Sequence, residues 1–195
     1  MWLIIANKDA TKVFFQRNTF LHILQFQKNT LSLQSNFFCN GKYIQDILST
    51  FAPNIKELSE ILEVSRKSLL TYLIYLEKAQ LIGLLQQDVS GLKTFTKPEK
   101  IYLDNSNLAY ALETEKPDLG NIRETFFFNQ LNIVSKVISG GKPDFKIDNK
   151  YTIEVGGKNK GHEQIMGIEN AHLALDNLEY GFMNKIPLWL FGMLY

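Results

Sequence analysis

The sequence predicts a mixed α/β (α+β) fold in two parts, a helix-turn-helix with a β-hairpin and then a small mixed sheet. Two helical patterns separated by a short turn occupy residues 54–80. An amphipathic helical pattern starts at residue 121 and is followed by alternating, strand-like segments. The chain has 195 residues, of which 45% are hydrophobic and 21% charged. This length and composition allow one globular domain or two small ones.

Residues 1–40 form a poorly defined N-terminal segment, because their apolar residues follow no clear period. We expect a winged helix-turn-helix over residues 41–100. Asn54 and Glu57 have the spacing of a capping box at the start of one helix, and Ser65 caps a second helix that runs to about Gln80. The segments "LIGLLQQ" (81–87) and "KTFTKP" (93–98) are typical of a β-hairpin, which would be the wing.

Residues 101–195 predict a small α/β domain built on a mixed sheet. A short strand and a helical start occupy residues 100–112. The helix from 121 to 137 is expected to bury a set of apolar residues, Ile122, Phe126, Leu131, Val134 and Val137. The segments 144–148 and 151–155 read as two strands joined by a tight turn at 149–150. A short helix at 162–168, a strand at 171–176 and a final apolar helix or strand follow.

Several function classes lack the residues that they need. Gly157-Lys158 suggests a phosphate loop, but Asn159 follows where a hydroxyl would hold Mg²⁺. The single cysteine, Cys39, excludes an internal disulfide and fits a cytoplasmic protein. The histidines have no metal-ligand spacing, and no apolar run is long enough to span a membrane. A net charge of +1 gives no general attraction to nucleic acid.

Two acids on the predicted hairpin are candidate catalytic and metal-binding residues. Asp144 and Glu154 can converge at one end of the sheet, and paired carboxylates suit a hard divalent ion such as Mg²⁺. A nearby lysine could orient an attacking water. This is the chemistry of the PD-(D/E)xK nucleases, whose spacing the segment resembles. That pattern places the lysine two residues after the second acid, where this chain has Gly156. The other candidates are Lys158, Glu124 on the preceding helix and Gln164 on the following one. The alternative is a solvated hairpin with charged edges.

The start of the second predicted helix is a candidate nucleic-acid-binding site. Helix-turn-helix proteins contact DNA with the first turn of this helix. The residues there are Ser65, Arg66, Lys67 and Ser68. Two basic residues are few, and three glutamates on the preceding helix (Glu57, Glu60 and Glu63) would repel phosphates. The charge pattern therefore favours a scaffold or partner-docking role over direct DNA binding.

Residues from about 41 to 195 resemble the C-terminal region of bacterial and archaeal AAA-type ATPases. The resemblance lies in five segments: "PNIKELSEILEVSRKSLLTYLIYLEKAQLIGLL", "KPEKIYLDNSNLAYAL", "NIRETFFFNQL", "DFKIDNKYTIEVGGKNKGHEQI" and "GFMNKIPLWLFGMLY". In those proteins an ATP-binding module precedes a winged helix and a restriction-endonuclease-like domain of unknown function. The resemblance implies the same two C-terminal domains here, at 41–100 and 101–195. It also implies an ATP-hydrolysing partner module, because this sequence has no Walker A motif.

We therefore expect a non-catalytic accessory module that docks a partner protein or nucleic acid beside an ATPase. Two alternatives remain open at this point. One is a Mg²⁺-dependent nuclease that uses Asp144, Glu154 and Lys158. The other is a winged-helix DNA-binding regulator that uses Arg66 and Lys67.

Overall fold

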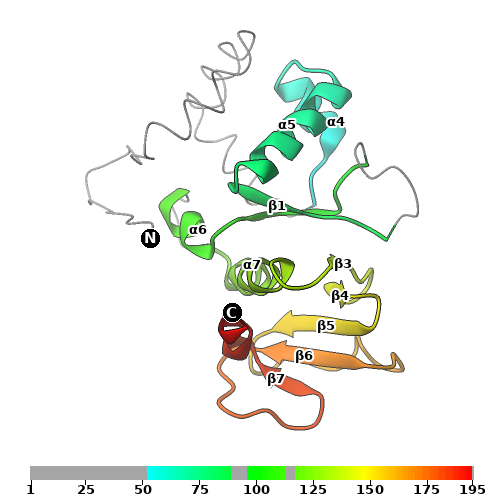
Figure 1. The fold of residues 1–195 in the computed structure, drawn as a ribbon, viewed down its shortest axis with the longest axis vertical. Helices are drawn as coiled ribbons and strands as arrows, with labels where there is room; N and C mark the ends of the chain where they lie inside the picture. The colour runs from blue at the N-terminus through cyan, green and yellow to red at the C-terminus, as the bar shows by residue number, and fades with distance from the viewer. Residues whose placement is uncertain (1–51, 89–95, 113–116, 195) are drawn as a thin grey trace.

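A computed structural model describes residues 52–88, 96–112 and 117–194 of the chain. Figure 1 shows these residues as a stack of layers: two helices, a two-stranded sheet, one long helix and a five-stranded sheet. The mixed α/β class predicted from the sequence is confirmed. The predicted N-terminal segment 1–40 lies outside the described residues. So do residues 41–51 of the predicted winged-helix region, and residues 89–95, which cover most of the predicted hairpin loop and the start of its second strand.

The first layer contains α4 (Ile55–Ile61) and α5 (Arg66–Lys78). The Asn54 side chain accepts the N–H of Glu57, and the Ser65 hydroxyl accepts the N–H of Ser68. Both caps were predicted from the sequence. Asn and Ser are favoured at this position because their side chains accept hydrogen bonds from N–H groups that the start of a helix leaves unpaired. The buried face of α5 is formed by Leu69, Leu70 and Leu73.

Strands β1 (Ile82–Leu85) and β2 (Lys100–Leu103) form an antiparallel pair, with Ile82 opposite Leu103. The strand that pairs with β1 is therefore 100–103 and not the predicted 93–98, of which residues 93–95 lie outside the described part. Strand β2 crosses residue 100, where the sequence suggested a domain boundary.

The two faces of this small sheet contribute to different cores, because successive side chains of a strand point to opposite faces. Ile101 packs with the α4–α5 residues in one core. Tyr102 and Leu85 pack with α7 and the larger sheet in the other. Lys100 lies two residues from Tyr102 and shares its face, which is turned toward α7. The small sheet thus joins the α4–α5 helix pair directly to the larger sheet and α7.

Helices α6 (Ser106–Leu112) and α7 (Leu119–Asn132) follow. The Asp118 side chain caps α7 by accepting the N–H of Asn121. The helix ends at Asn132, five residues before the predicted end. Val134 is therefore 48% exposed and not buried as predicted, whereas Val137 is buried as part of a strand.

The large sheet has the order β3-β4-β5-β6-β7. Its strands are β3 (Val137–Ser139), β4 (Phe145–Ile147), β5 (Tyr151–Gly156), β6 (Ala171–Leu175) and β7 (Lys185–Pro187). The pairs β3–β4 and β4–β5 are antiparallel, whereas β5, β6 and β7 run parallel to one another. The turn between β4 and β5 was predicted, and Asp148 and Asn149 adopt the positive φ that it requires.

Two predicted elements differ in the structure. Residues 162–168 form successive turns and not a helix; Gly167 has a φ of +77° and Ile165 is buried. The final apolar segment forms β7 and then the 3-10 helix η2 (Leu188–Met193), which packs against α7 through Phe191 and Phe127. Buried aromatic rings fill the space between α7 and both sheets, with Tyr102 stacked on Phe128 at 4.9 Å. No helix within the described ranges has the length and apolar character needed to cross a membrane.

Candidate functional site: the acid–lysine corner

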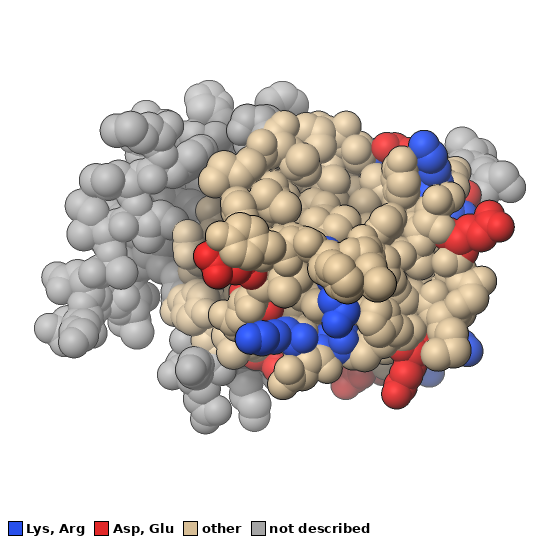
Figure 2. Space-filling model, turned by 90° about the horizontal axis from the view of Figure 1, so that it is seen from below, with Lys and Arg blue, Asp and Glu red and all other residues tan. Residues whose placement is uncertain are grey.

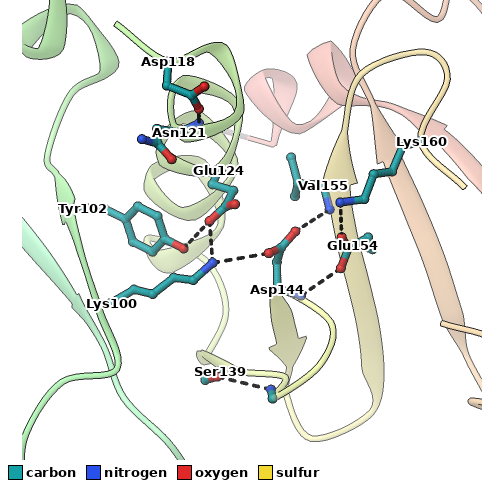
Figure 3. Close-up of polar contacts among 11 residues, drawn as sticks. Lys100, Tyr102, Asp118, Asn121, Glu124, Ser139, Asp144, Glu154, Val155 and Lys160 are labelled. Carbon is teal, nitrogen blue, oxygen red and sulfur yellow. Dashed lines mark hydrogen bonds and ion pairs between the residues drawn. The ribbon is translucent and has the colours of Figure 1, made fainter. Parts of the chain in front are cut away.

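Three carboxylates that are far apart in the sequence meet between α7 and the large sheet (Figure 3). Asp144 immediately precedes β4, Glu154 lies within β5, and Glu124 lies on α7. The backbone N–H of Asp144 donates to Glu154 Oε2 at 3.1 Å, and the N–H of Val155 donates to Asp144 Oδ2 at 3.0 Å. The convergence of Asp144 and Glu154, which follows from the register of the two strands, agrees with the sequence prediction.

Lys100 reaches into this group from β2. Its Nζ atom lies 2.8 Å from Glu124 Oε2 and 3.3 Å from Asp144 Oδ1, so one ammonium bridges two carboxylates. The Tyr102 hydroxyl donates to the same Glu124 oxygen at 2.8 Å. The small sheet therefore supplies both partners of Glu124.

A second lysine, Lys160, pairs with Glu154 at 2.5 Å. The Glu154 side chain is only 1% exposed, whereas that of Lys160 is 34% exposed. The stem of Lys160 crosses over Gly156: a Cβ atom at residue 156 would lie 2.7 Å from both Cβ and Cγ of Lys160. The absence of a side chain at Gly156 is therefore what lets Lys160, which is six residues after Glu154, reach that carboxylate.

Gln164 completes the surroundings of Glu154. With its amide nitrogen turned toward the acceptors, it lies 2.6 and 2.7 Å from the two Glu154 oxygens and 3.1 Å from the Lys142 carbonyl oxygen. This orientation is the one that the surrounding hydrogen-bond acceptors require. We call the set of Lys100, Tyr102, Glu124, Asp144, Glu154, Lys160 and Gln164 the acid–lysine corner.

Burial sets the protonation behaviour of the corner. It raises the pKa of Glu124, and the Asp144 charge raises it further. Burial likewise raises the pKa of Glu154, although Lys160 opposes this effect. Burial disfavours the charged form of Lys100, but the hydrogen bond and attraction to Glu124 outweigh it, so the pKa of Lys100 is raised. The pKa of Tyr102 is raised well above its ordinary value by burial and then by Glu124, so it donates as a neutral phenol.

The corner does not fit a Mg²⁺ ion as its side chains stand. Its oxygen donors are of the right chemical type for Mg²⁺. However, Lys100 Nζ already bridges Glu124 and Asp144, and both Glu154 oxygens accept hydrogen bonds from other groups. In the part of the chain that the structure describes, no group of three or more His, Cys, Asp or Glu residues is arranged to hold a metal ion.

The structure brings together four of the five residues predicted as catalytic: Glu124, Asp144, Glu154 and Gln164. The fifth, Lys158, is exposed, and the lysine at Glu154 is Lys160. Lys100 and Tyr102 were missed, because they lie more than twenty residues before Glu124 and only the pairing of β2 with β1 places them. The alternation of "KIYL" did carry a signal that Lys100 and Tyr102 share a face.

The predicted nucleic-acid-binding residues lie at the start of α5. Ser65, Arg66 and Lys67 are exposed, and Ser68 is half-buried. The hydroxyl groups of Ser65 and Ser68 lie 2.8 Å apart and belong to the helix cap. These residues form a surface separate from the acid–lysine corner, on the other side of the small sheet.

Comparisons with protein-family models, with curated proteins and with solved structures found no match.

Proposed function

We propose that this chain is a non-catalytic recognition module that docks a partner protein beside an ATP-hydrolysing module. The observation that carries this proposal is the closed state of the acid–lysine corner. Both oxygens of Asp144 and both of Glu154 accept hydrogen bonds or ion pairs from groups of the same chain. Carboxylate oxygens that already accept hydrogen bonds or ion pairs from the chain have fewer lone pairs available to bind Mg²⁺.

The corner instead connects the two parts of the fold. Lys100 and Tyr102 belong to the small sheet, and they hold Glu124 of α7 and Asp144 of the large sheet. Apolar contacts of Leu85 and Tyr102 with the main core act in the same direction. Such a link would keep the helix-turn-helix and the α/β part in one fixed arrangement, as recognition by two surfaces requires. In this proposal the helix-turn-helix and the two-stranded sheet form a winged helix, and the remainder is a restriction-endonuclease-like domain without catalysis.

An exposed apolar surface favours a protein as the docked partner. The loop before β7 lies at the lower end of the molecule in Figure 1, which Figure 2 faces, and most residues visible there are neither acidic nor basic. Large apolar side chains are exposed on this loop, namely Tyr180 (76%), Phe182 (68%) and Met183 (86%), and Met193 (74%) is exposed on η2. Clusters of exposed apolar side chains are typical of protein-binding surfaces.

The docking role can be tested by photo-crosslinking. A photoreactive amino acid at Met183 should capture a protein that carries a Walker A sequence, and the same label at Asp88 should not. Asp88 is suited to this control because it lies on an exposed polar segment. Capture of proteins without an ATP-binding motif, or equal capture from both positions, would count against an ATPase partner.

The second candidate function is phosphodiester cleavage at the acid–lysine corner. One observation favours it: Lys160 and Gln164 both contact Glu154. The nuclease pattern has a lysine where this chain has Gly156, and Lys160 places an ammonium beside the acid from another position. This function would require Lys100 to withdraw from Glu124 and Asp144 so that they could take Mg²⁺. Cutting of DNA or RNA by the purified chain with Mg²⁺ or Mn²⁺, abolished by Glu154→Gln, would establish it over the non-catalytic role.

A further inference from the structure

We propose that Lys100 is a tethered substitute for a divalent cation, and that the corner consequently binds no metal while β2 is docked. The inference goes beyond the proposed function, because it concerns how the chain excludes a metal and not what the module docks. It rests on the mismatch between an oxygen-rich donor set and the ammonium that occupies it.

The position of Lys100 Nζ is the first part of the argument. The ammonium contacts Glu124 Oε2 on α7 and Asp144 Oδ1 just before β4. A divalent ion would bridge the same two carboxylates by binding their oxygens. An ammonium held between these oxygens takes the place of a divalent ion and repels it, because like charges a few ångströms apart destabilise each other in a protein interior.

The burial of the surrounding groups is the second part. The side chains of Glu124 and Asp144 are 18% and 12% exposed, and that of Lys100 is 27% exposed. In their ionised form, neighbouring carboxylates with so little exposure are stabilised by a cation between them, since solvent screens their repulsion poorly. The chain provides that cation from β2, whose position is fixed by pairing with β1 and by the buried Tyr102 ring.

The third part is that the cation between Glu124 and Asp144 belongs to β2, so its presence depends on the position of the small sheet. A free metal ion would neutralise the carboxylates wherever β2 lay. An ammonium carried by β2 compensates part of their charge only when β2 is docked on α7. The docking of the small sheet and the charge compensation of the corner are therefore coupled.

Metal rescue tests this inference. We expect the wild-type chain to show no Mn²⁺ binding by calorimetry at millimolar Mn²⁺, and a melting temperature that is insensitive to Mn²⁺. Lys100→Met should melt at a lower temperature without metal and regain stability with Mn²⁺. Its apparent affinity for Mn²⁺ should exceed that of the wild type by at least about tenfold, because a contacting positive charge has been removed.

Matched variants separate this effect from general loss of an ion pair. Lys136→Met removes an ammonium from an exposed pair with Asp88 at 3.4 Å, and it should neither bind Mn²⁺ nor gain stability from it. The double variant Lys100→Met with Glu124→Gln should lose the rescue. If Lys100→Met does not fold without metal, Lys100→Gln keeps a polar side chain and should show the same gain in Mn²⁺ affinity.

Two results would overturn the inference. Mn²⁺ binding by the wild type with the same affinity as the Lys100 variants would show that the ammonium excludes nothing. Absence of binding and of any melting shift in both Lys100 variants would show that the carboxylates are not arranged around a cation position. Neither result depends on the docking role, which the crosslinking experiment tests separately.

Discussion

Gly156→Ala is the substitution whose effect the structure defines most directly. An added Cβ would lie 2.7 Å from Cβ and Cγ of Lys160 and 2.9 Å from its Cδ. These separations are far below a normal carbon–carbon contact of about 3.5–4.0 Å. Two of the three atoms are close to the Lys160 backbone, so rotation of the lysine end cannot relieve the overlap. The lysine stem must leave, and its ion pair with Glu154 must break.

The size of the effect follows from two contributions. Overpacking in a fitted region costs about 1–3 kcal/mol. Breaking an ion pair to a fully buried charge costs about 3–5 kcal/mol, but Lys160 is 34% exposed and Gln164 and the Asp144 N–H still serve Glu154. We therefore expect a loss of about 2–3 kcal/mol in the free energy of unfolding, once these two discounts are applied.

Urea unfolding followed by circular dichroism measures this loss, and the neighbouring glycine provides the control. A Cβ at Gly157 would meet only the Arg123 guanidinium at 3.6 Å, which is an ordinary contact. Gly157→Ala should therefore be neutral or slightly stabilising, by up to about 1 kcal/mol, through reduced chain entropy. In a Lys160→Gly background, Gly156→Ala should lose most of its cost, because the overlapping atoms are gone. Equal stability of Gly156→Ala and Gly157→Ala in the otherwise wild-type chain would refute the reasoning.

Three further predictions concern the rest of the fold. Gly83→Ala should lower the free energy of unfolding by about 1–3 kcal/mol in urea titrations, because its Cβ would lie 2.4 Å from Cε1 of the buried Phe128 ring; an unchanged midpoint would contradict this. Ser65→Ala should cost about 1 kcal/mol by the same measurement, since it removes the α5 cap, whereas Ser59→Ala should cost much less. The raised pKa of Glu154 means that the folded state binds more protons there than the unfolded state as pH falls toward 4.5. As the pH is lowered toward 4.5, the free energy of unfolding of the wild type should therefore rise relative to that of Glu154→Gln. Parallel curves of unfolding free energy against pH for the two proteins would exclude this linkage.

Local sequence signals predicted the parts of the fold that depend on near neighbours. The caps at Asn54 and Ser65 follow from side-chain chemistry within three residues, and the turn at 148–150 follows from residues that tolerate positive φ. The three-residue strand β3 was missed because its apolar run is short and merges with the helical pattern before it. The helix expected at 162–168 was wrong: these residues form successive turns, and the left-handed Gly167 prevents a helix from continuing past residue 166.

In the candidate site too, the residues positioned by local sequence could be predicted and the others could not. Asp144 and Glu154 could be brought together from the sequence because a tight turn fixes the register of adjacent strands. Lys160 could not, since its path depends on a turn in which its own N–H donates to the Gly157 carbonyl at 2.9 Å. No helical or strand period describes such a turn. The pairing pattern of the PD-(D/E)xK nucleases pointed to residue 156, and the structure fills that space from residue 160.

The two lysines of the corner pair with the carboxylates that a metal ion would need to bind, so they bear on whether the site can be catalytic. Glu124, Asp144 and Glu154 bring three acidic groups into a region where burial raises the pKa of both glutamates. Lys160 pairs with Glu154, which leaves the charge of Glu124 and Asp144 to be compensated by one further cation and by the raised pKa of Glu124. Lys100 and a divalent ion are alternative solutions to that single requirement. A recognition module needs Lys100 at this position, because it fixes β2 in place. A nuclease instead needs a divalent ion there that can bind the oxygens of a phosphate. The occupant of the space between Glu124 and Asp144 therefore decides between the two functions, and Lys100 is the residue through which they can be told apart.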